Sequence, residues 1–205
     1  MVYTPAFVDN LTLTADFWRI EQEDLVGIRS YQNIADLDYY YRMNGSSNPN
    51  VIRSAATADD IAFFAGSGLE AVGDMMDIYG LFENLDSRTT EGLDLGIYYK
   101  LNRTAWGDFD FKLNGAKLLK AYQSVDEESA KLASLGLALD DVGDMIEMDG
   151  RPEWQASGTV TWRYDNWGAG MHAKYVGDFY DTSAVHDETG EYWHVSSWNT
   201  LSLYG

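Results

Sequence analysis

Carboxylates are the most numerous charged groups in this sequence that could take part in chemistry. Five of them fall within ten residues: Asp140, Asp141, Asp144, Glu147 and Asp149. Their spacing does not match the D-x-[DN]-x-[DN]-G pattern of calcium loops. We therefore expect a solvated acidic loop, with calcium binding by that loop as the alternative.

A second carboxylate pair, Asp108 and Asp110, is separated by one residue, which puts both side chains on one face of a strand. Glycosidases use two carboxylates as acid and base or nucleophile. The alternative is ordinary polar lining of a strand face, and the same alternative applies to His172 and Lys174. No Ser-His-Asp, nucleotide-loop or metalloprotease spacing is present in the sequence.

A run of aromatic residues is the clearest candidate for ligand contact. Tyr39, Tyr40 and Tyr41 are followed by Arg42. Adjacent rings beside charged groups suit stacking on sugars, with the polar groups contacting hydroxyls. The alternative is that the tyrosines pack within their own loop or join an aromatic belt. We predict these four residues as possible ligand-contacting loop residues.

Composition excludes several classes of function. The chain has 205 residues with 33 acidic and 14 basic side chains, a net charge of −19, which argues against a nucleic-acid partner. The absence of cysteine excludes disulfides, a thiol nucleophile and a cysteine zinc site. Aromatic residues make up 14% of the chain, which is atypical of a disordered acidic protein. The first residues lack the basic and apolar regions of a signal peptide, and no stretch approaches ~18 apolar residues.

Alternation with a period of two predicts an all-β fold with long antiparallel strands. In residues 153–164, for example, Trp154, Val160 and Trp162 alternate with Gln155 and Thr161. The same pattern predicts six strands in all, over residues 11–17, 93–101, 107–122, 153–164, 168–179 and 195–204.

The links between these strands alternate between short and long. Short links follow residues 101 and 164, and each contains a tryptophan, Trp106 or Trp167. Long polar links cover roughly 28–76, 124–152 and 181–191, and we expect short helices in them at 57–64 and 127–135. Short turns at one end and long loops at the other are typical of an outer-membrane β-barrel wall with aromatic girdles. A soluble sandwich with one face in its core is the alternative, and strand length and the charged polar face favour the barrel.

Five segments, in order along the chain, carry a resemblance to a known family. They are LTLTADFWRIEQEDLVG (11–27), NLDSRTTEGLDLGIYYKL (84–101), GDFDFKLNGAKLLKAY (107–122), GRPEWQASGTVTWRYDNWGAGMHAKYVGDFYD (150–181) and YWHVSSWNTLSLY (192–204). Together they resemble the C-terminal half of TonB-dependent outer-membrane receptors.

The resemblance implies a 22-stranded transmembrane barrel with a plug domain, long extracellular loops, and strands beyond the six predicted here. Because the smallest such barrels have ~8 strands, we expect residues 1–205 to be an incomplete wall, a partial barrel domain without the plug and the final strands. The family implies an active-transport receptor of a Gram-negative outer membrane that binds a scarce solute. Its energy comes from TonB, through an N-terminal region outside this sequence.

The implied partners are membrane lipid and a small solute of the oligosaccharide or ferric siderophore class, with no catalytic residue, cofactor or metal. The alternatives are a passive porin-type channel and a soluble β-sandwich carbohydrate-binding module. The long links 28–76, 124–153 and 181–191 hold 19 acidic and 5 basic residues. An acidic outer rim repels anionic ligands, which weakens the siderophore option.

Overall fold

The computed structural model describes residues 1–137, 139, 142–186 and 188–205, and the chain forms two compact units. Unit 1 comprises Met1–Glu21, Thr89–Tyr122 and Asp144–Gly205, and unit 2 comprises Gln22–Arg88 and Gln123–Gly143. Strands predominate in the described residues, and the sheets are antiparallel and not closed, which confirms an all-β fold. None of the described helices has the length and apolar character needed to cross a membrane.

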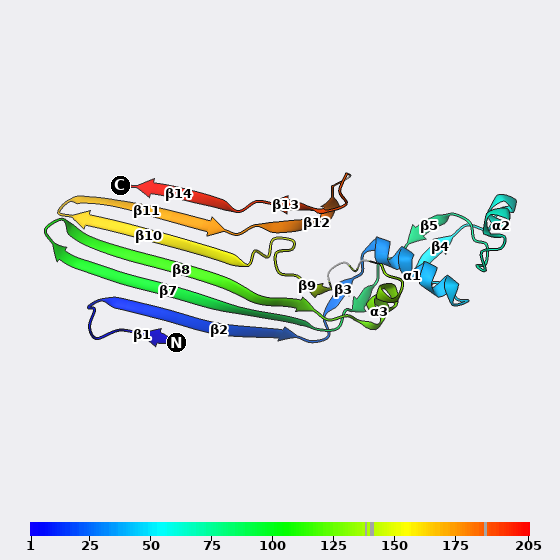
Figure 1. Ribbon diagram of the computed structural model, residues 1–205, viewed down its shortest axis with the longest axis horizontal. Coiled ribbons are helices and arrows are strands. Elements are labelled where there is room, and N and C mark those ends of the chain that lie inside the picture. The colour runs from blue at the N-terminus through cyan, green and yellow to red at the C-terminus, as the bar shows by residue number, and fades with distance from the viewer. Residues whose placement is uncertain (138, 140–141, 187) are drawn as a thin grey trace. The chain divides into compact units, whose positions relative to one another are not determined.

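Unit 1 is built on one large sheet whose strands follow each other in chain order. From edge to edge the strands are β1 (Val2–Tyr3), β2 (Leu11–Gln22), β7 (Arg88–Thr104), β8 (Gly107–Gln123), β10 (Trp154–Tyr164), β11 (Trp167–Val176) and β14 (Trp198–Tyr204), and β9 (Gly143–Asp144) also pairs with β8. Figure 1 shows the long strands side by side. The six predicted strands correspond to β2, β7, β8, β10, β11 and β14, so their existence and order are confirmed.

The predicted alternation of short and long links is also confirmed. Two residues join β7 to β8 and two join β10 to β11, whereas the other links between long strands are much longer. Gly107 begins β8 at a φ of 101°, a left-handed conformation that favours glycine. A Cβ at this position would collide with the carbonyl oxygen of Arg163 on the neighbouring strand. The first short turn therefore depends on glycine for both its backbone angle and its close approach.

One face of this sheet is apolar and the other is polar, and in the described part of unit 1 neither face is covered by another sheet. The row Leu113, Gly158, Ala173 and Leu201 crosses four adjacent strands on one face. The next row, on the opposite face, is polar and contains Asn114, Ser157, Lys174 and Thr200. Leu113 is 50% exposed and Leu201 is 62% exposed. Among the described residues of unit 1, no second sheet packs on the apolar face.

A short hairpin in unit 1 overlaps the predicted link at 181–191. It pairs β12 (Phe179–Val185) with β13 (Tyr192–Val195), so the loop expectation is wrong for Asp181–Val185. The last long strand begins at Trp198, three residues later than predicted, because Val195 belongs to this hairpin.

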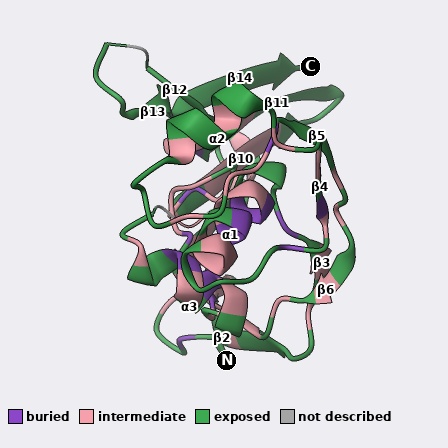
Figure 2. Cartoon of the chain, turned by 90° about the vertical axis from the view of Figure 1, so that its right-hand side faces the viewer, coloured by how far each residue is buried: buried purple, intermediate pink, exposed green. Residues whose placement is uncertain are grey.

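Unit 2 has a small core of its own. It contains the strand pairs β3 (Val26–Ile28) with β6 (Phe82–Asn84) and β4 (Val51–Arg53) with β5 (Met75–Ile78), and the helices α1 (Tyr31–Met43), α2 (Ala58–Phe64) and α3 (Glu127–Ser134). Figure 2 shows buried residues on α1 and α3. Ile34 and Leu37 of α1 and Leu132 of α3 are among the buried residues.

The predicted helices at 57–64 and 127–135 are confirmed as α2 and α3. Thr57 and Asp60 form a reciprocal capping box at the start of α2, and Asp126 caps α3. Helix α1 lies where the sequence analysis expects a loop, so that expectation is wrong for Tyr31–Met43. Ser30 caps this helix by accepting a hydrogen bond from the backbone of Asn33.

Candidate functional site

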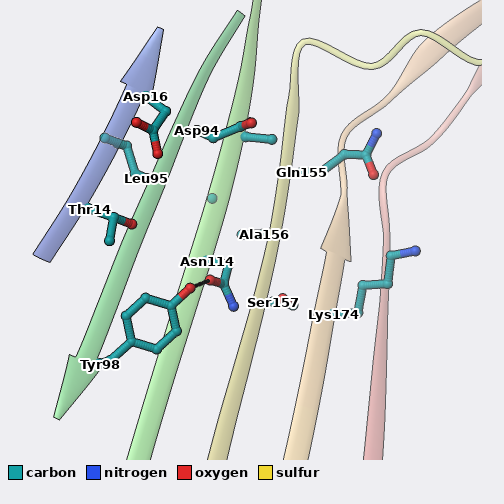
Figure 3. Close-up of a pocket in the computed structure, with 12 residues that line it drawn as sticks. Thr14, Asp16, Asp94, Leu95, Tyr98, Asn114, Gln155, Ala156, Ser157 and Lys174 are labelled. Carbon is teal, nitrogen blue, oxygen red and sulfur yellow. Dashed lines mark hydrogen bonds between the residues drawn. The ribbon is translucent and has the colours of Figure 1, made fainter. Parts of the chain in front are cut away.

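The polar face of the unit 1 sheet contains a cavity of about 400 Å³. Side chains from five adjacent strands line it, and Figure 3 shows them on β2, β7, β8, β10 and β11. The polar groups are those of Thr14, Asp16, Asp94, Tyr98, Asn114, Gln155, Ser157 and Lys174. The hydroxyl of Tyr98 donates a hydrogen bond of 2.7 Å to Oδ1 of Asn114. Hydroxyls, amides, carboxylates and one ammonium group can together bind a polar, hydroxylated solute.

Aromatic rings on this polar face pack over glycines of the neighbouring strand. A Cβ at Gly92 would collide with the indole ring of Trp18, and a Cβ at Gly170 would collide with the ring of Tyr204. Glycine in a strand interior weakens it, and an aromatic ring over the glycine restores some of the lost packing. The rings therefore cover gaps in the polar face without a second layer.

The predicted carboxylate pair is engaged with neighbouring groups. Asp110 forms a hydrogen bond of 2.6 Å with Nη2 of Arg163 and an ion pair of 3.6 Å with Lys100. Asp108 accepts a hydrogen bond of 2.7 Å from the backbone nitrogen of Arg103. These contacts fit the lining of a polar face. His172 likewise lies 2.9 Å from Oγ1 of Thr159 through Nδ1, and Lys174 belongs to the cavity described above.

Aromatic side chains mark both ends of the apolar face. At the short-turn end, Trp162 stacks on Tyr164 and donates from Nε1 to the carbonyl of Trp106, 2.6 Å away. Trp106 and Trp167 lie at the short turns as predicted and are 78% and 73% exposed. At the other end, the ammonium of Lys117 lies 4.9 Å from the ring centre of Trp154.

The spacing of these aromatic rows gives the height of the apolar face. Trp154 and Trp162 lie eight residues apart on β10, which corresponds to roughly 26 Å along the strand. With the tilt of about 40° that is usual in transmembrane barrels, the height is ~20 Å, close to the ~25 Å apolar band of such barrels.

The predicted ligand-contacting residues Tyr39, Tyr40, Tyr41 and Arg42 all lie on α1. Successive residues of a helix point about 100° apart, so the three tyrosine rings cannot form one flat stacking surface. Tyr40 and Tyr41 meet edge to face, with ring centres 6.0 Å apart, and Tyr39 is 46% exposed. Contact of these residues with a ligand stays a prediction.

Tyr41 contributes to the packing of α1 against α3. Its hydroxyl donates a hydrogen bond to the carboxylate of Glu128 at 2.7 Å and accepts one from Lys131 at 3.3 Å. Burial, and then the hydrogen bond with Glu128, raise the pKa of the Tyr41 hydroxyl, so this contact persists across neutral pH.

The structure describes three of the five residues of the predicted acidic cluster, Asp144, Glu147 and Asp149. Asp140 and Asp141 lie outside the described residues. Of the others, Asp149 accepts hydrogen bonds from the backbone and hydroxyl of Thr182, and Asp144 accepts one from the backbone of Ile146. Within the described ranges, no group of three or more His, Cys, Asp or Glu side chains could hold a metal ion.

Sequence reasoning missed a charged cluster in the interior of unit 2. The side chain of Arg29 is 4% exposed and forms ion pairs of 2.8 Å with Asp126 and 3.2 Å with Glu83. Its Nη1 donates to the hydroxyl of Ser129 at 2.8 Å. Burial raises the pKa of the Asp126 carboxyl, but hydrogen bonds from Ser129 and Arg29 together lower it below its ordinary value. Since these partners are 54 to 100 residues from Arg29 along the chain, no local signal predicts this cluster.

Comparisons of this chain with protein-family models, with curated proteins and with solved structures gave no match. The geometry of the two units is therefore the basis for inferring function.

Proposed function

We propose that unit 1 is a section of the wall of a transmembrane β-barrel that belongs to an outer-membrane solute receptor. One observation carries the proposal: a single-layer sheet has an exposed apolar face bounded by aromatic rows, and a polar face behind it. Lipid covers such a face in a barrel, and aromatic girdles mark the two interfaces.

The lack of a covering layer argues against the soluble sandwich. Inward-facing residues of a sandwich meet the inner face of a second sheet about 10 Å away. Leu95, Ile97, Leu113 and Met171 of the apolar face are all exposed, and no such sheet packs on them in the described part of unit 1. A contiguous exposed apolar surface of this kind is typical of a membrane or protein contact.

In the proposed barrel, further strands pair with the two open edges of the sheet. Unpaired backbone groups at a strand edge are not tolerated within a bilayer, so the wall must close. The resemblance to TonB-dependent receptors implies 22 strands and a plug, and it places the long links outside the cell. The polar face and its cavity then line the lumen through which the solute passes.

The proposed transport is active and non-covalent. Solute binds to the outer loops and to polar side chains of the lumen, and the TonB complex supplies energy through the plug. The cavity around Asn114 and Ser157 supplies hydrogen-bonding groups of both kinds, donors and acceptors, which suits a hydroxylated solute. No described residue has to form a covalent bond in this process.

The test uses the absence of cysteine from the chain, which allows single labels without background. Cysteines are placed in turn at Phe111, Lys112, Leu113 and Asn114 of β8, and each is spin-labelled with the protein in phospholipid vesicles. We expect labels at 111 and 113 to be accessible to oxygen dissolved in lipid, and labels at 112 and 114 to an aqueous nickel complex. Uniform aqueous access at all four positions would refute the membrane wall.

A further inference from the structure

Unit 2 contains a cavity of about 550 Å³ beside the C-terminal end of α1. Two arginines, Arg42 and Arg53, and two hydroxyls, those of Ser46 and Ser47, are part of its lining. All of its lining residues belong to unit 2, so its geometry does not depend on the sheet of unit 1.

Arg42 is fixed in position but incompletely bonded. Its guanidinium lies 4.9 Å from the ring centre of Phe64, and Nη2 donates a 2.7 Å hydrogen bond to the backbone carbonyl of Glu70. Its Nε is shielded from solvent, and no described residue accepts a hydrogen bond from it. A buried donor without an acceptor is costly, so the described residues leave this guanidinium incompletely bonded.

This incomplete bonding is not explained by a shortage of carboxylates. Unit 2 carries 16 acidic and five basic side chains. Among the described residues, none of these carboxylates forms an ion pair with Arg42. Glu70 also lines this cavity, and it contacts Arg42 through its backbone carbonyl. The guanidinium therefore has unused capacity for an oxyanion inside an acidic unit.

The charge of Arg53, in the same wall, is offset by an ion pair with Asp38. Its Nη2 lies 2.9 Å from Oδ2 of Asp38, whose side chain is 2% exposed. The other oxygen of Asp38 accepts a 3.1 Å hydrogen bond from the backbone of Asn48. This pair offsets its own charges and orients Arg53, so Arg42 is the cation of the lining that no described carboxylate pairs with.

We propose that this cavity binds the carboxylate of a small hydroxylated monoanion, a sugar acid in chemical class. The planar fork of Arg42 matches a carboxylate, and the hydroxyls of Ser46 and Ser47 match those of the ligand. The net charge of unit 2 opposes ligands with two or more negative charges, whereas screening beyond about 8 Å leaves the local pair with Arg42 effective. The inference rests on the proposed function as a solute receptor and names the chemical class of the solute.

The first test alters the ligand and leaves the protein unchanged. D-glucuronate, D-glucuronamide and D-glucose 6-phosphate are titrated onto the full chain by saturation-transfer NMR. We expect glucuronate to bind at least ~10-fold more tightly than its neutral amide, because the charge-assisted hydrogen bonds are lost in the amide. The phosphate ester should bind more weakly than glucuronate. Equal affinity for acid and amide, or no binding of glucuronate at roughly 10 mM, would overturn the proposal.

The second test alters Arg42 against a matched control. Arg42→Gln should reduce glucuronate affinity at least ~10-fold, and Arg42→Lys should recover only part of the loss, since lysine keeps the charge but not the fork. Arg88→Gln removes the same charge from unit 2 at a residue whose side chain donates to Gln123 and which is not part of the lining of this cavity. An equal loss in Arg88→Gln would mean that only net charge matters, which contradicts the proposal.

These results are separable from those for the proposed wall. The comparison of acid with amide uses the unaltered chain, so it stands even if a variant fails to fold. Loss of the alternating label pattern on β8 would refute the membrane wall and leave the ligand result valid. Absence of glucuronate binding would refute this inference and leave the wall intact.

Discussion

Replacement of Leu113 by arginine tests the proposed membrane wall through its energetics. Leu113 pairs with Gly158, which is four residues from Trp154 and four from Trp162 on β10. At ~3.3 Å per residue and a tilt of about 40°, Leu113 lies roughly 10 Å from each aromatic row. That position is close to the bilayer midplane, where a lipid-facing arginine costs about 2–4 kcal/mol. The equilibrium constant for folding should therefore fall by about 30-fold or more.

The size of this effect separates membrane from water. In water, a half-exposed leucine can be replaced by arginine at a cost within about 0.5 kcal/mol. The matched control is Ser157→Arg on the opposite face, where the new cation faces the cavity that contains Asp16 and Asp94. Urea unfolding of the protein from phospholipid vesicles, followed by tryptophan fluorescence, measures both variants. Equal stabilities for the Leu113 and Ser157 variants would refute the reasoning.

Three further outcomes are expected. Gly92→Ala should lower the free energy of unfolding by about 1–3 kcal/mol, because the new Cβ would collide with Trp18. Gly115→Ala, where the atom nearest to the new Cβ is 3.9 Å away, should lower it by less than about 0.5 kcal/mol. The midpoints of urea unfolding measure both. Arg29→Gln should destabilise unit 2 by about 3 kcal/mol, because it leaves Asp126 without its buried cation, and limited proteolysis reports the loss. The lowered pKa of the Asp126 carboxyl stabilises unit 2 above pH ~4 and ceases to do so as pH falls through the folded value. Asp126→Asn, which keeps the helix cap, should flatten the acid dependence of protease resistance.

Each of these outcomes has a result that contradicts it. Equal urea midpoints for the two glycine variants would mean that the indole ring moves freely off Gly92. Unchanged proteolysis of the Arg29 variant would mean that the charged cluster adds nothing to unit 2. An Asp126→Asn protein that loses protease resistance over the same acidic range as the original would assign that pH dependence to other carboxylates.

The strands of unit 1 could be predicted because local sequence patterns indicate where each strand lies and in what order the strands follow. The alternation of apolar and polar residues from Trp154 to Trp162 indicates directly that the strand has two different faces. A link of two residues is too short for anything but an antiparallel pairing of the strands that it joins. The sequence could also suggest that the apolar face is not a core, since the strands are long and the opposite face is charged. What it could not provide is the register that puts Leu113, Gly158 and Ala173 in one row.

Helix α1 was not predicted because its sequence lacks a strong helical pattern. Tyr39, Tyr40 and Tyr41 are adjacent rings with only moderate helix propensity, and alone they resemble a recognition loop. The helix is stabilised by tertiary contacts: Tyr41 bonds to Glu128 and Ile34 is buried. Long-range packing of this kind overrides local preference and leaves no local signal.

The cations of unit 2 connect its folding with its proposed ligand chemistry. Arg29, Arg53 and Lys131 each form an ion pair with a carboxylate, and Arg88 donates to the side-chain carbonyl of Gln123. Among the described residues, Arg42 differs from these four because no side chain accepts a hydrogen bond from it. Four of the five cations of this acidic unit bond to side chains within it, whereas Arg42 lies in a cavity wall and bonds to no described side chain, which leaves its guanidinium available to an external carboxylate. The same pairing explains why the net negative charge does not exclude a monoanion, since long-range repulsion is screened and the local contact is not.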